Sequence, residues 1–121
     1  MPGEGAGCEG PRPLPGILGL IAALTEGSIA AIFVSVDDRI RYANRAACAL
    51  TGYTHEELCG MEAWIPAHPD HRDAERERTR AREKRGPTPA RYEMKLLTKR
   101  GEVRWVDVSA AAVEFEGRPA G

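Results

Sequence analysis

The fold is decided by residues 39–60, which read RIRYANRAACALTGYTHEELCG. Residues 39–43 are a short run of β-favouring residues and predict a strand. Directly after it, the side-chain oxygen of Asn44 can accept a hydrogen bond from the first turn of a helix over residues 45–51, which Gly52 ends. The pattern therefore predicts an abrupt change from strand to helix.

A second short helix is expected within the same stretch. Thr54 and Glu57 form a capping box, in which the Thr54 hydroxyl accepts from the Glu57 amide and the Glu57 carboxylate accepts from the Thr54 amide. Gly60 closes this helix. Asp70 can cap a longer helix over about residues 71–85. The positions with a predicted structural role are thus Asn44, Gly52, Thr54, Glu57, Gly60, Asp70 and Gly101.

Hairpins are expected on both sides of these helices. Residues 30–36 and 39–43 are β-favouring runs around Asp37-Asp38, which signals a tight turn. From residue 90 the period changes to two, which predicts a half-exposed strand. After a turn at Gly101, residues 103–115 are expected to form a long return strand, and residues 116–119 a third turn.

Composition narrows the classes of function. A chain of 121 residues makes about one domain, and its formal charge of −1 argues against strong binding to nucleic acid or to an anionic membrane. The apolar stretch at residues 17–24 is far shorter than the roughly 20 residues that a membrane helix needs. Three cysteines without C-x-x-C spacing favour neither a disulfide framework nor a zinc site. We therefore expect a reducing, cytoplasmic setting.

The chain divides into three predicted segments. Residues 1–16 read as a flexible leader rich in Gly and Pro, residues 17–26 as an amphipathic helix, and residues 27–121 as the main domain. The apolar side chains of the helix fall on one stripe and are candidates for pairing two copies of the chain. They are Ile17, Leu18, Ile21 and Leu24.

The predicted helix at residues 71–85 is highly charged. Residues 72–85 carry seven basic and four acidic side chains, and their apolar members are Ala74 and Ala81, so the expected buried stripe is thin. Its basic residues could contact nucleic acid, or the helix could be solvated with internal ion pairs, and the mixed charges favour the second interpretation. The basic candidates are Arg76, Arg80 and Lys84.

The ordered set of landmarks resembles the PAS family of sensory modules over about residues 17–119. The residues that carry it are Arg39-Ile40-x-Tyr42-Ala43-Asn44-x-Ala46, Leu50-Thr51-Gly52-Tyr53-x-x-Glu56-Glu57-Leu58-x-Gly60, His68-Pro69-Asp70, Tyr92-Glu93 and Gly101-Glu102-Val103-Arg104-Trp105-Val106. The resemblance implies an α+β fold in which short helices cross one face of a five-stranded antiparallel sheet. The last strand, central in that sheet, is expected beyond Pro119 and is absent from this sequence, so we expect a C-terminally truncated domain completed by strand exchange or rearrangement.

The resemblance also implies a small pocket between the helices and the sheet. Each candidate lining residue can equally be an ordinary core residue. Trp105 is the most informative, because its ring must either fill the core or offer its N–H to a ligand. The candidates are Ile32, Val34, Ala47, Leu50, Leu58, Trp64, Tyr92, Met94 and Trp105.

No cofactor is required by the sequence. Photoactive flavin members of the family carry Asn-Cys-Arg shortly after the Glu-Glu-Leu-x-Gly segment, whereas Gly60 is followed here by Met61-Glu62-Ala63, which argues against flavin photochemistry. Haem needs an axial histidine, but His55 is expected to be solvated in the first turn of a helix, and His71 to be exposed at the start of a charged helix. His68 belongs to a turn that members of the family without haem also have. They also lack a third ligand for zinc, so no metal site is predicted.

The expected function is that of a non-enzymatic sensory module, because no catalytic constellation is recognisable. We expect the input domain of a larger signalling protein such as a sensor histidine kinase, acting by small-molecule sensing and as a homodimer, with any kinase or cyclase activity in a downstream output domain. The alternatives are a ligand-free dimerisation module and a haem- or flavin-dependent sensor. No nucleic-acid partner or membrane contact is expected.

Overall fold

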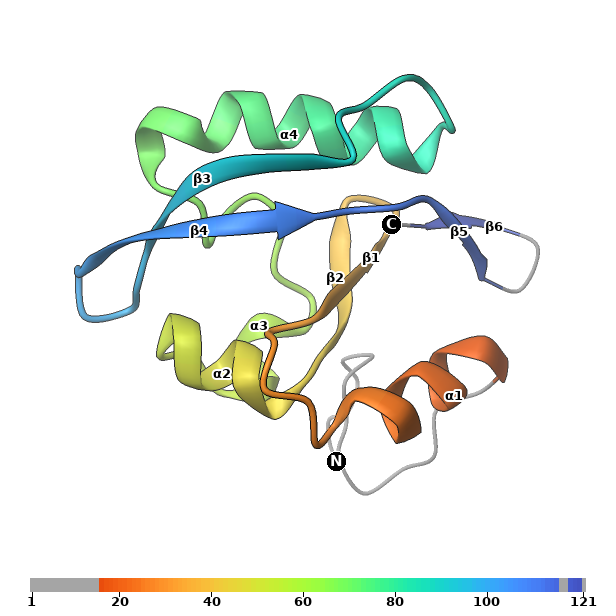
Figure 1. Ribbon diagram of the computed structural model, residues 1–121, viewed down its shortest axis with the longest axis horizontal. Coiled ribbons are helices and arrows are strands. Elements are labelled where there is room, and N and C mark those ends of the chain that lie inside the picture. The colour runs from red at the N-terminus through yellow and green to blue at the C-terminus, as the bar shows by residue number, and fades with distance from the viewer. Residues whose placement is uncertain (1–15, 116–117, 121) are drawn as a thin grey trace.

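The computed structural model describes residues 16–115 and 118–120, and every structural statement below concerns these residues. The predicted leader lies outside them apart from Gly16. In chain order the elements are α1 (Gly16–Thr25), β1 (Phe33–Val36), β2 (Arg39–Ala43), α2 (Arg45–Thr51), α3 (His55–Leu58), α4 (Pro69–Glu83), β3 (Arg91–Leu97), β4 (Val103–Ser109), β5 (Val113–Phe115) and β6 (Arg118–Ala120) (Figure 1).

Two antiparallel hairpins form the main β-structure, which confirms the predicted α+β class. β1 and β2 pair around Asp37 and Asp38, whose φ angles of 53° and 70° are the positive values that a tight two-residue hairpin turn requires. β3 and β4 pair over their whole length, and Gly101 turns between them with φ of +89°. Figure 1 shows α4 above β3 and β4, and α1, α2 and α3 on the other side of the molecule.

The strands are shorter than the sequence pattern predicts. Residues 30–32 precede β1 without pairing, and β4 ends at Ser109 instead of continuing to residue 115. The chain then makes a third hairpin, β5 with β6, and β6 lies beside β1 and α4. In the described residues β1 and β4 belong to separate two-stranded sheets, and no strand pairs with both of them.

The local signals for α2 and α3 are confirmed. Asn44 caps α2 by accepting from the Ala47 amide, and Gly52 ends it with φ of +80°. Both hydrogen bonds of the capping box between Thr54 and Glu57 are present at the start of α3.

The start of α4 differs from the prediction. The helix begins at Pro69, two residues before the expected start, and its N-cap is His68, whose Nδ1 accepts from the Asp70 amide at 3.1 Å. Asp70 is therefore inside the helix and is not its cap. Proline suits the first helical position because its missing N–H would have no partner there.

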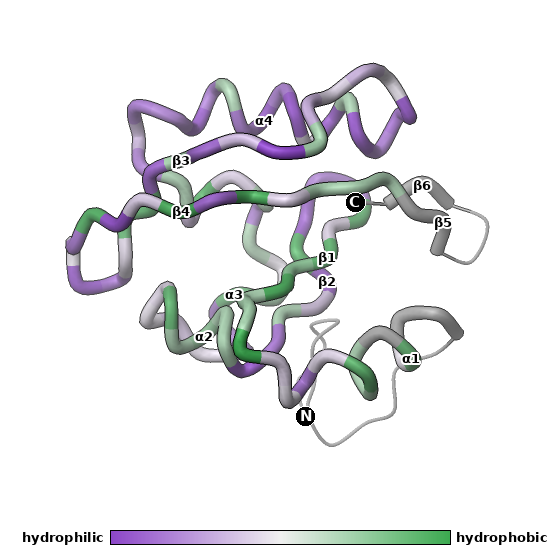
Figure 2. The backbone as a smooth tube through the Cα atoms, in the orientation of Figure 1, coloured by the Kyte–Doolittle hydropathy of each residue, from purple (hydrophilic) through white to green (hydrophobic). Residues whose placement is uncertain are grey.

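Among the described residues, two small clusters form much of the core. One lies beneath α2 and α3 and contains Ile40, Ala43, Ala47 and Leu58, and the other contains Ala67, Met94 and Leu96. Figure 2 shows that β1 and α2 contain many hydrophobic residues, whereas the residues of α4 are mostly hydrophilic. The aliphatic, alanine-rich core agrees with the low share of aromatic residues, 6%.

The inward face of α4 is polar, which corrects the prediction of a thin alanine stripe. Ala74 is exposed and Ala81 only half-buried. Ion pairs and hydrogen bonds offset the cost of burying this face. Its buried residues are Glu75, Thr79, Arg82 and Glu83.

The turn between β3 and β4 is tied to α3. The Lys99 ammonium pairs with the Glu57 carboxylate, and the Lys99 amide donates to the Thr51 carbonyl at 2.9 Å. The Lys99 hydrogen bond, followed by the one from the Thr54 amide, holds the pKa of Glu57 below its ordinary value.

We expect Lys99→Gln to raise the pKa of Glu57 toward its ordinary value, because the ammonium that stabilises the carboxylate is removed. In the wild type this stabilisation is present above the ordinary glutamate pKa and is lost as the pH falls through the lowered folded-state pKa. NMR titration of the Glu57 carboxyl measures the change, and Lys99→Arg, which keeps the ion pair, is the control. An unchanged pKa in Lys99→Gln would show that the capping box alone sets it.

Candidate functional site

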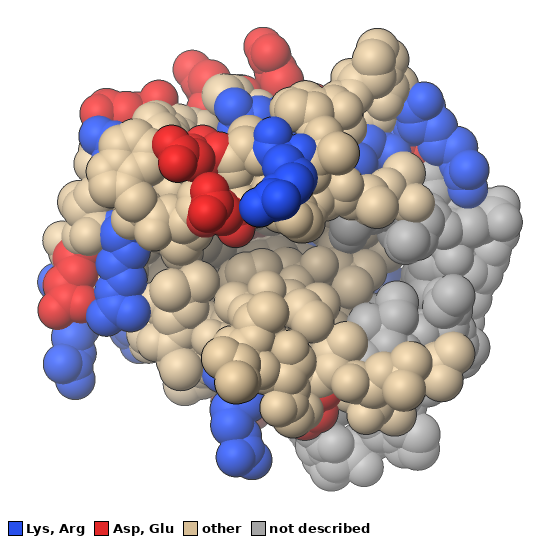
Figure 3. Space-filling view, in the orientation of Figure 1, with Lys and Arg blue, Asp and Glu red and all other residues tan. Residues whose placement is uncertain are grey.

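A cavity of about 510 Å³ lies between β1, β4 and α4. Figure 3 shows the surface hollowed between the layer that contains α4 and the part that contains α2 (Figure 3). Its volume falls within the range of roughly 300–1,000 Å³ that is usual for small-molecule sites. The lining includes Ala31, Ile32, Phe33 and Ser35 near β1, Met94, Leu96, Val106 and Val108 from β3 and β4, and Glu75, Thr79 and Arg82 from α4.

One wall of the cavity is polar and the others are mainly apolar. The polar wall comes from Glu75, Thr79 and Arg82, which lie four and then three residues apart and so share one face of α4. The opposite walls consist mainly of aliphatic side chains from the strands. The polar residues of the lining outside α4 include Ser35, Asp107 and Ser109.

Glu75 is the centre of a buried ion-pair cluster on the polar wall. Its Oε1 accepts from the Tyr92 hydroxyl at 2.9 Å and from Arg78 Nη1 at 3.3 Å. Arg82 Nη2 lies 3.7 Å from Glu75 Oε2. Burial, together with the Glu75 charge, raises the pKa of Tyr92, so this hydroxyl stays protonated and keeps donating to the carboxylate at neutral pH.

The predicted pocket residues separate into three groups. Ile32, Leu50 and Met94 line the cavity. Tyr92 stands behind the polar wall through its bond to Glu75. Four others are buried in the core and are absent from the described lining: Val34, Ala47, Leu58 and Trp64.

Trp105 corrects the prediction that its ring fills the core or faces a ligand in the cavity. The side chain is 63% exposed. The hairpin register pairs Trp105 with Lys95 and places Val106 opposite Met94, so Trp105 is on the outer face. There its ring contacts His71 edge-on, at 5.7 Å between ring centres, and Lys95 Nζ at 5.5 Å. The sequence shows the alternation of each strand but does not say which face of β4 meets the cavity.

The sequence interpretation missed the polar wall, Glu75, Thr79 and Arg82. Their signal was present as a helical spacing of polar residues within a highly charged helix. It was hidden because the same helix carries many exposed charges, and burial of a polar face becomes visible only when its partner strands are in place.

Two of the basic residues considered for nucleic-acid contact, Arg76 and Arg80, have their guanidinium groups over the Trp64 ring, at 5.5 and 5.2 Å from the ring centre.

The histidines have structural contacts away from the cavity lining. His68 Nδ1 caps α4, and His71 Nδ1 accepts from the Lys95 amide at 3.0 Å. His55 Nε2 lies 4.0 Å from the Glu26 carboxylate. Within residues 16–115 and 118–120, no three His, Cys, Asp or Glu residues come together as a possible metal centre.

The cysteines differ from one another. Cys48 is a half-buried free thiol, and burial followed by the Glu26 charge raises its pKa. Cys59 is buried and disulfide-bonded, which the cysteine spacing did not predict. Neither residue is part of the described cavity lining.

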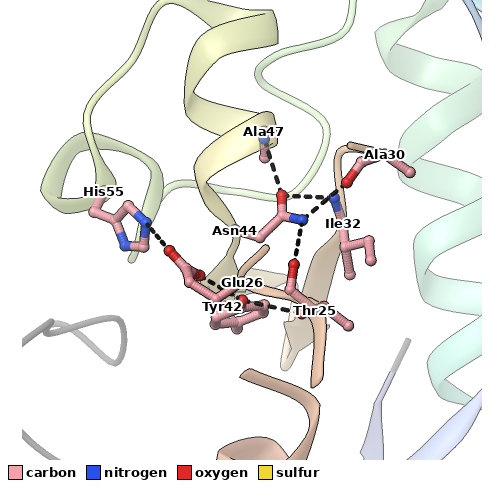
Figure 4. A network of polar contacts seen from close by, with 8 residues as sticks. All are labelled: Thr25, Glu26, Ala30, Ile32, Tyr42, Asn44, Ala47 and His55. Atoms are coloured by element: carbon pink, nitrogen blue, oxygen red, sulfur yellow. Dashed lines mark hydrogen bonds and ion pairs between the residues drawn. The ribbon is translucent and has the colours of Figure 1, made fainter. Parts of the chain in front are cut away.

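A buried hydrogen-bond network joins the cavity edge to α1 (Figure 4). Asn44 is fully buried at 0% exposure, and its Oδ1 accepts from the amides of Ile32 at 3.0 Å and Ala47 at 2.9 Å. Its Nδ2 donates to the carbonyls of Thr25 at 3.0 Å and Ala30 at 2.8 Å. One side chain thus holds the end of α1, the segment before β1 and the start of α2.

A second set of contacts fixes the end of α1 from another side. The Tyr42 hydroxyl donates to Glu26 Oε1 at 2.8 Å and lies 3.0 Å from Thr25 Oγ1. Burial raises the pKa of Tyr42, and the Glu26 carboxylate adds to this shift. The last turn of α1 is therefore anchored to β2 as well as to Asn44.

In the part of the chain that the structure describes, no helix combines the length and the apolar character that a membrane crossing needs.

Comparison with known proteins gives one family and one fold. A sequence model of the PAS fold matches residues 19–120. Similar solved structures include the PAS domain of a protein from Colwellia psychrerythraea, with 20% identity, a TM-score of 0.67, and coverage of 87% of this chain and 92% of that one. A domain of the sensory box sensor histidine kinase/response regulator from Geobacter sulfurreducens has 22% identity, a TM-score of 0.62, and coverage of 86% and 90%.

The same fold occurs in a eukaryotic channel. The PAS domain of the fruit-fly ELK potassium channel has 16% identity and a TM-score of 0.65, with coverage of 88% of this chain and 94% of that one. A search among curated proteins found no match. At these identities the solved structures indicate the shared fold and leave function to be argued from the site.

We expect Asn44→Ala to lower the free energy of unfolding by about 3 kcal/mol, because four backbone groups lose the fully buried side chain that pairs with them. Urea unfolding measures the loss. Thr54→Ala removes an exposed helix cap and should cost only about 1 kcal/mol. Equal losses in the two variants would mean that Asn44 serves as an N-cap and nothing more.

Proposed function

The chain belongs to the PAS family, and from that premise we propose that it is a sensory input module of a larger signalling protein such as a sensor histidine kinase. A small molecule binds in the cavity, and the bound state is passed through α1 to an output domain. The observation that carries this proposal is the cavity of about 510 Å³ whose edge at Ile32 is hydrogen-bonded to Asn44. The structural similarity to the domain of the sensory box sensor histidine kinase/response regulator from Geobacter sulfurreducens supports a histidine kinase as the proposed output domain.

The proposed route of the signal is short. Ile32 lines the cavity, and its amide donates to Asn44, which also holds the last carbonyl of α1, that of Thr25. A ligand that moves the segment before β1 lengthens or bends these hydrogen bonds. A second stable position of α1 would then be favoured in proportion to the difference in ligand affinity between the two states.

Catalysis is not part of the proposed role. The described lining holds no histidine that could serve as a base, and the hydroxyl of Ser35 donates to the Glu83 carboxylate without a third catalytic group beside it. Kinase or cyclase activity would belong to the output domain. The proposed location is the cytoplasm, where such output domains find their nucleotides.

A homodimer formed through α1 is the second element of the proposal. Leu20 and Leu24 of α1 are 56% and 73% exposed. Apolar helix surface of this kind is usually covered by a partner. The side chains of Ile17, Leu18 and Ile21, also named as dimer candidates, lie outside the described residues. Strand exchange beside β1 or β4 is a further way to join two copies, because each is paired with only one strand in the described sheets.

The exposed leucines also favour the alternative, a dimerisation module without a ligand. Native mass spectrometry of the full chain separates the two. Extra mass that disappears on denaturation supports small-molecule sensing and gives the mass of the ligand. A dimer without added mass, unchanged after incubation with cell extract, contradicts sensing and leaves the dimerisation module. A coloured preparation would instead favour a haem- or flavin-dependent sensor.

The dimer is tested by placing charges on α1. We expect Leu20→Asp combined with Leu24→Asp to give a folded monomer, because two carboxylates would have to be buried in the helix pair. Size-exclusion chromatography with light scattering measures the mass in solution. Ile29→Asp is the matched control, since Ile29 is 98% exposed but lies outside α1. A dimer that survives the double substitution would remove α1 from the interface.

A further inference from the structure

Two buried polar atoms on the cavity wall have no hydrogen-bond partner. They are Thr79 Oγ1 and Arg82 Nη1, both on α4. Thr79 is 1% exposed and Arg82 is 7% exposed, and both residues line the cavity. Native proteins pair nearly all buried polar atoms, so two unpaired ones within one turn of a helix, beside a cavity, indicate that a ligand pairs with them.

The ion-pair cluster around Glu75 carries more positive than negative charge. Glu75 is shared by two guanidinium groups, because its Oε1 accepts from Arg78 at 3.3 Å while Arg82 Nη2 remains 3.7 Å from its Oε2. The other buried carboxylate of α4, Glu83, has partners other than Arg82. It accepts from the Ser35 hydroxyl at 2.9 Å and from the Asp38 amide at 3.1 Å. An anion beside Arg82 would balance this charge.

The remaining walls of the cavity indicate the chemistry of the rest of the ligand. Apart from Phe33, the apolar side chains that line the cavity in the described residues are aliphatic, including Leu96 and Val108. Such walls suit a flexible hydrocarbon chain better than a planar ring system, for which stacking partners would be needed.

We propose that the cavity binds an aliphatic carboxylic acid, with its carboxylate on Thr79 Oγ1 and Arg82 Nη1 and its hydrocarbon chain among the residues of β3 and β4. This rests on the proposed sensory function and deepens it by naming the class of ligand. A guanidinium and a hydroxyl are both donors, and two oxygens of one carboxylate can accept from them together.

Binding of the acid is coupled to a movement of the cavity wall. Both donor atoms are shielded from solvent, so the carboxylate reaches them only when side chains at α4 shift. Glu83 connects the end of α4 to Ser35 of β1 through its carboxylate. A shift of α4 is therefore transmitted to the hairpin whose preceding segment is held by Asn44.

Isothermal titration calorimetry of the full chain with octanoate and with 1-octanol tests the head-group site. We expect octanoate to bind at least about tenfold more tightly than the alcohol, because only the acid supplies a charged acceptor. Thr79→Val should weaken the binding of octanoate by about tenfold without lowering the melting temperature, since the hydroxyl it removes is unpaired. Arg82→Met should weaken octanoate binding further, until its affinity equals that of 1-octanol.

Thr51→Val is the matched control. It makes the same change at a buried threonine whose hydroxyl is already bonded, to the Ala47 carbonyl at 2.8 Å, and which is absent from the described lining. It should lower stability and leave octanoate affinity unchanged.

Two results overturn the assignment. Equal affinity for octanoate and octanol, with no effect of Thr79→Val or Arg82→Met, rejects the carboxylate site but leaves a ligand-binding cavity and hence the proposed sensory function. Binding of neither compound rejects the aliphatic class of ligand. The native mass spectrum then decides the proposed function independently, because it detects a ligand of any chemistry.

Discussion

The position of α1 depends on the carboxamide of Asn44. Its nitrogen donates hydrogen bonds to the carbonyls of Thr25 and Ala30, and its oxygen accepts from the amides of Ile32 and Ala47. The four distances lie between 2.8 and 3.0 Å. The Asn44 side chain is fully buried, so its hydrogen bonds are shielded from water on that side. A single residue therefore links the flanking helix, the cavity edge and α2. Asparagine is suited to this task because it is both a double donor and an acceptor.

The parts of the fold that follow from local chemistry were predictable from the sequence. The cap at Asn44, the capping box at Thr54 and the glycine at residue 52 each need only a few neighbouring residues, and the structure confirms all three. The start of α4 was placed wrongly because two residues could serve as the cap, and His68 takes that role in place of Asp70. The end of β4 was missed because β-favouring residues occur again at Val113 and Phe115, which belong to the separate strand β5.

The cavity was predictable only in part. Ile32, Leu50 and Met94, which were among the predicted pocket residues, line the cavity because apolar residues of strands and helices point inward. Trp105 was misplaced because a strand pattern does not identify the face that meets the core until the hairpin register is known. Thr79 and Arg82 were missed because a charged helix is expected to be solvated. The hydrogen bond between Tyr92 of β3 and Glu75, the ion-pair partner of Arg82, joins distant parts of the chain and is not visible in the sequence.

Hydrogen exchange of the backbone amides, with and without saturating octanoate, tests most directly whether the cavity communicates with α1. The network predicts a coupled change in the protection of the Ile32 amide and of the amides of α1, because both depend on Asn44. Amides in the exposed turn around Gly101 should exchange at the same rate in both samples. Unchanged protection of α1 while octanoate is bound would contradict the account, since the cavity would then be filled without any effect on the flanking helix.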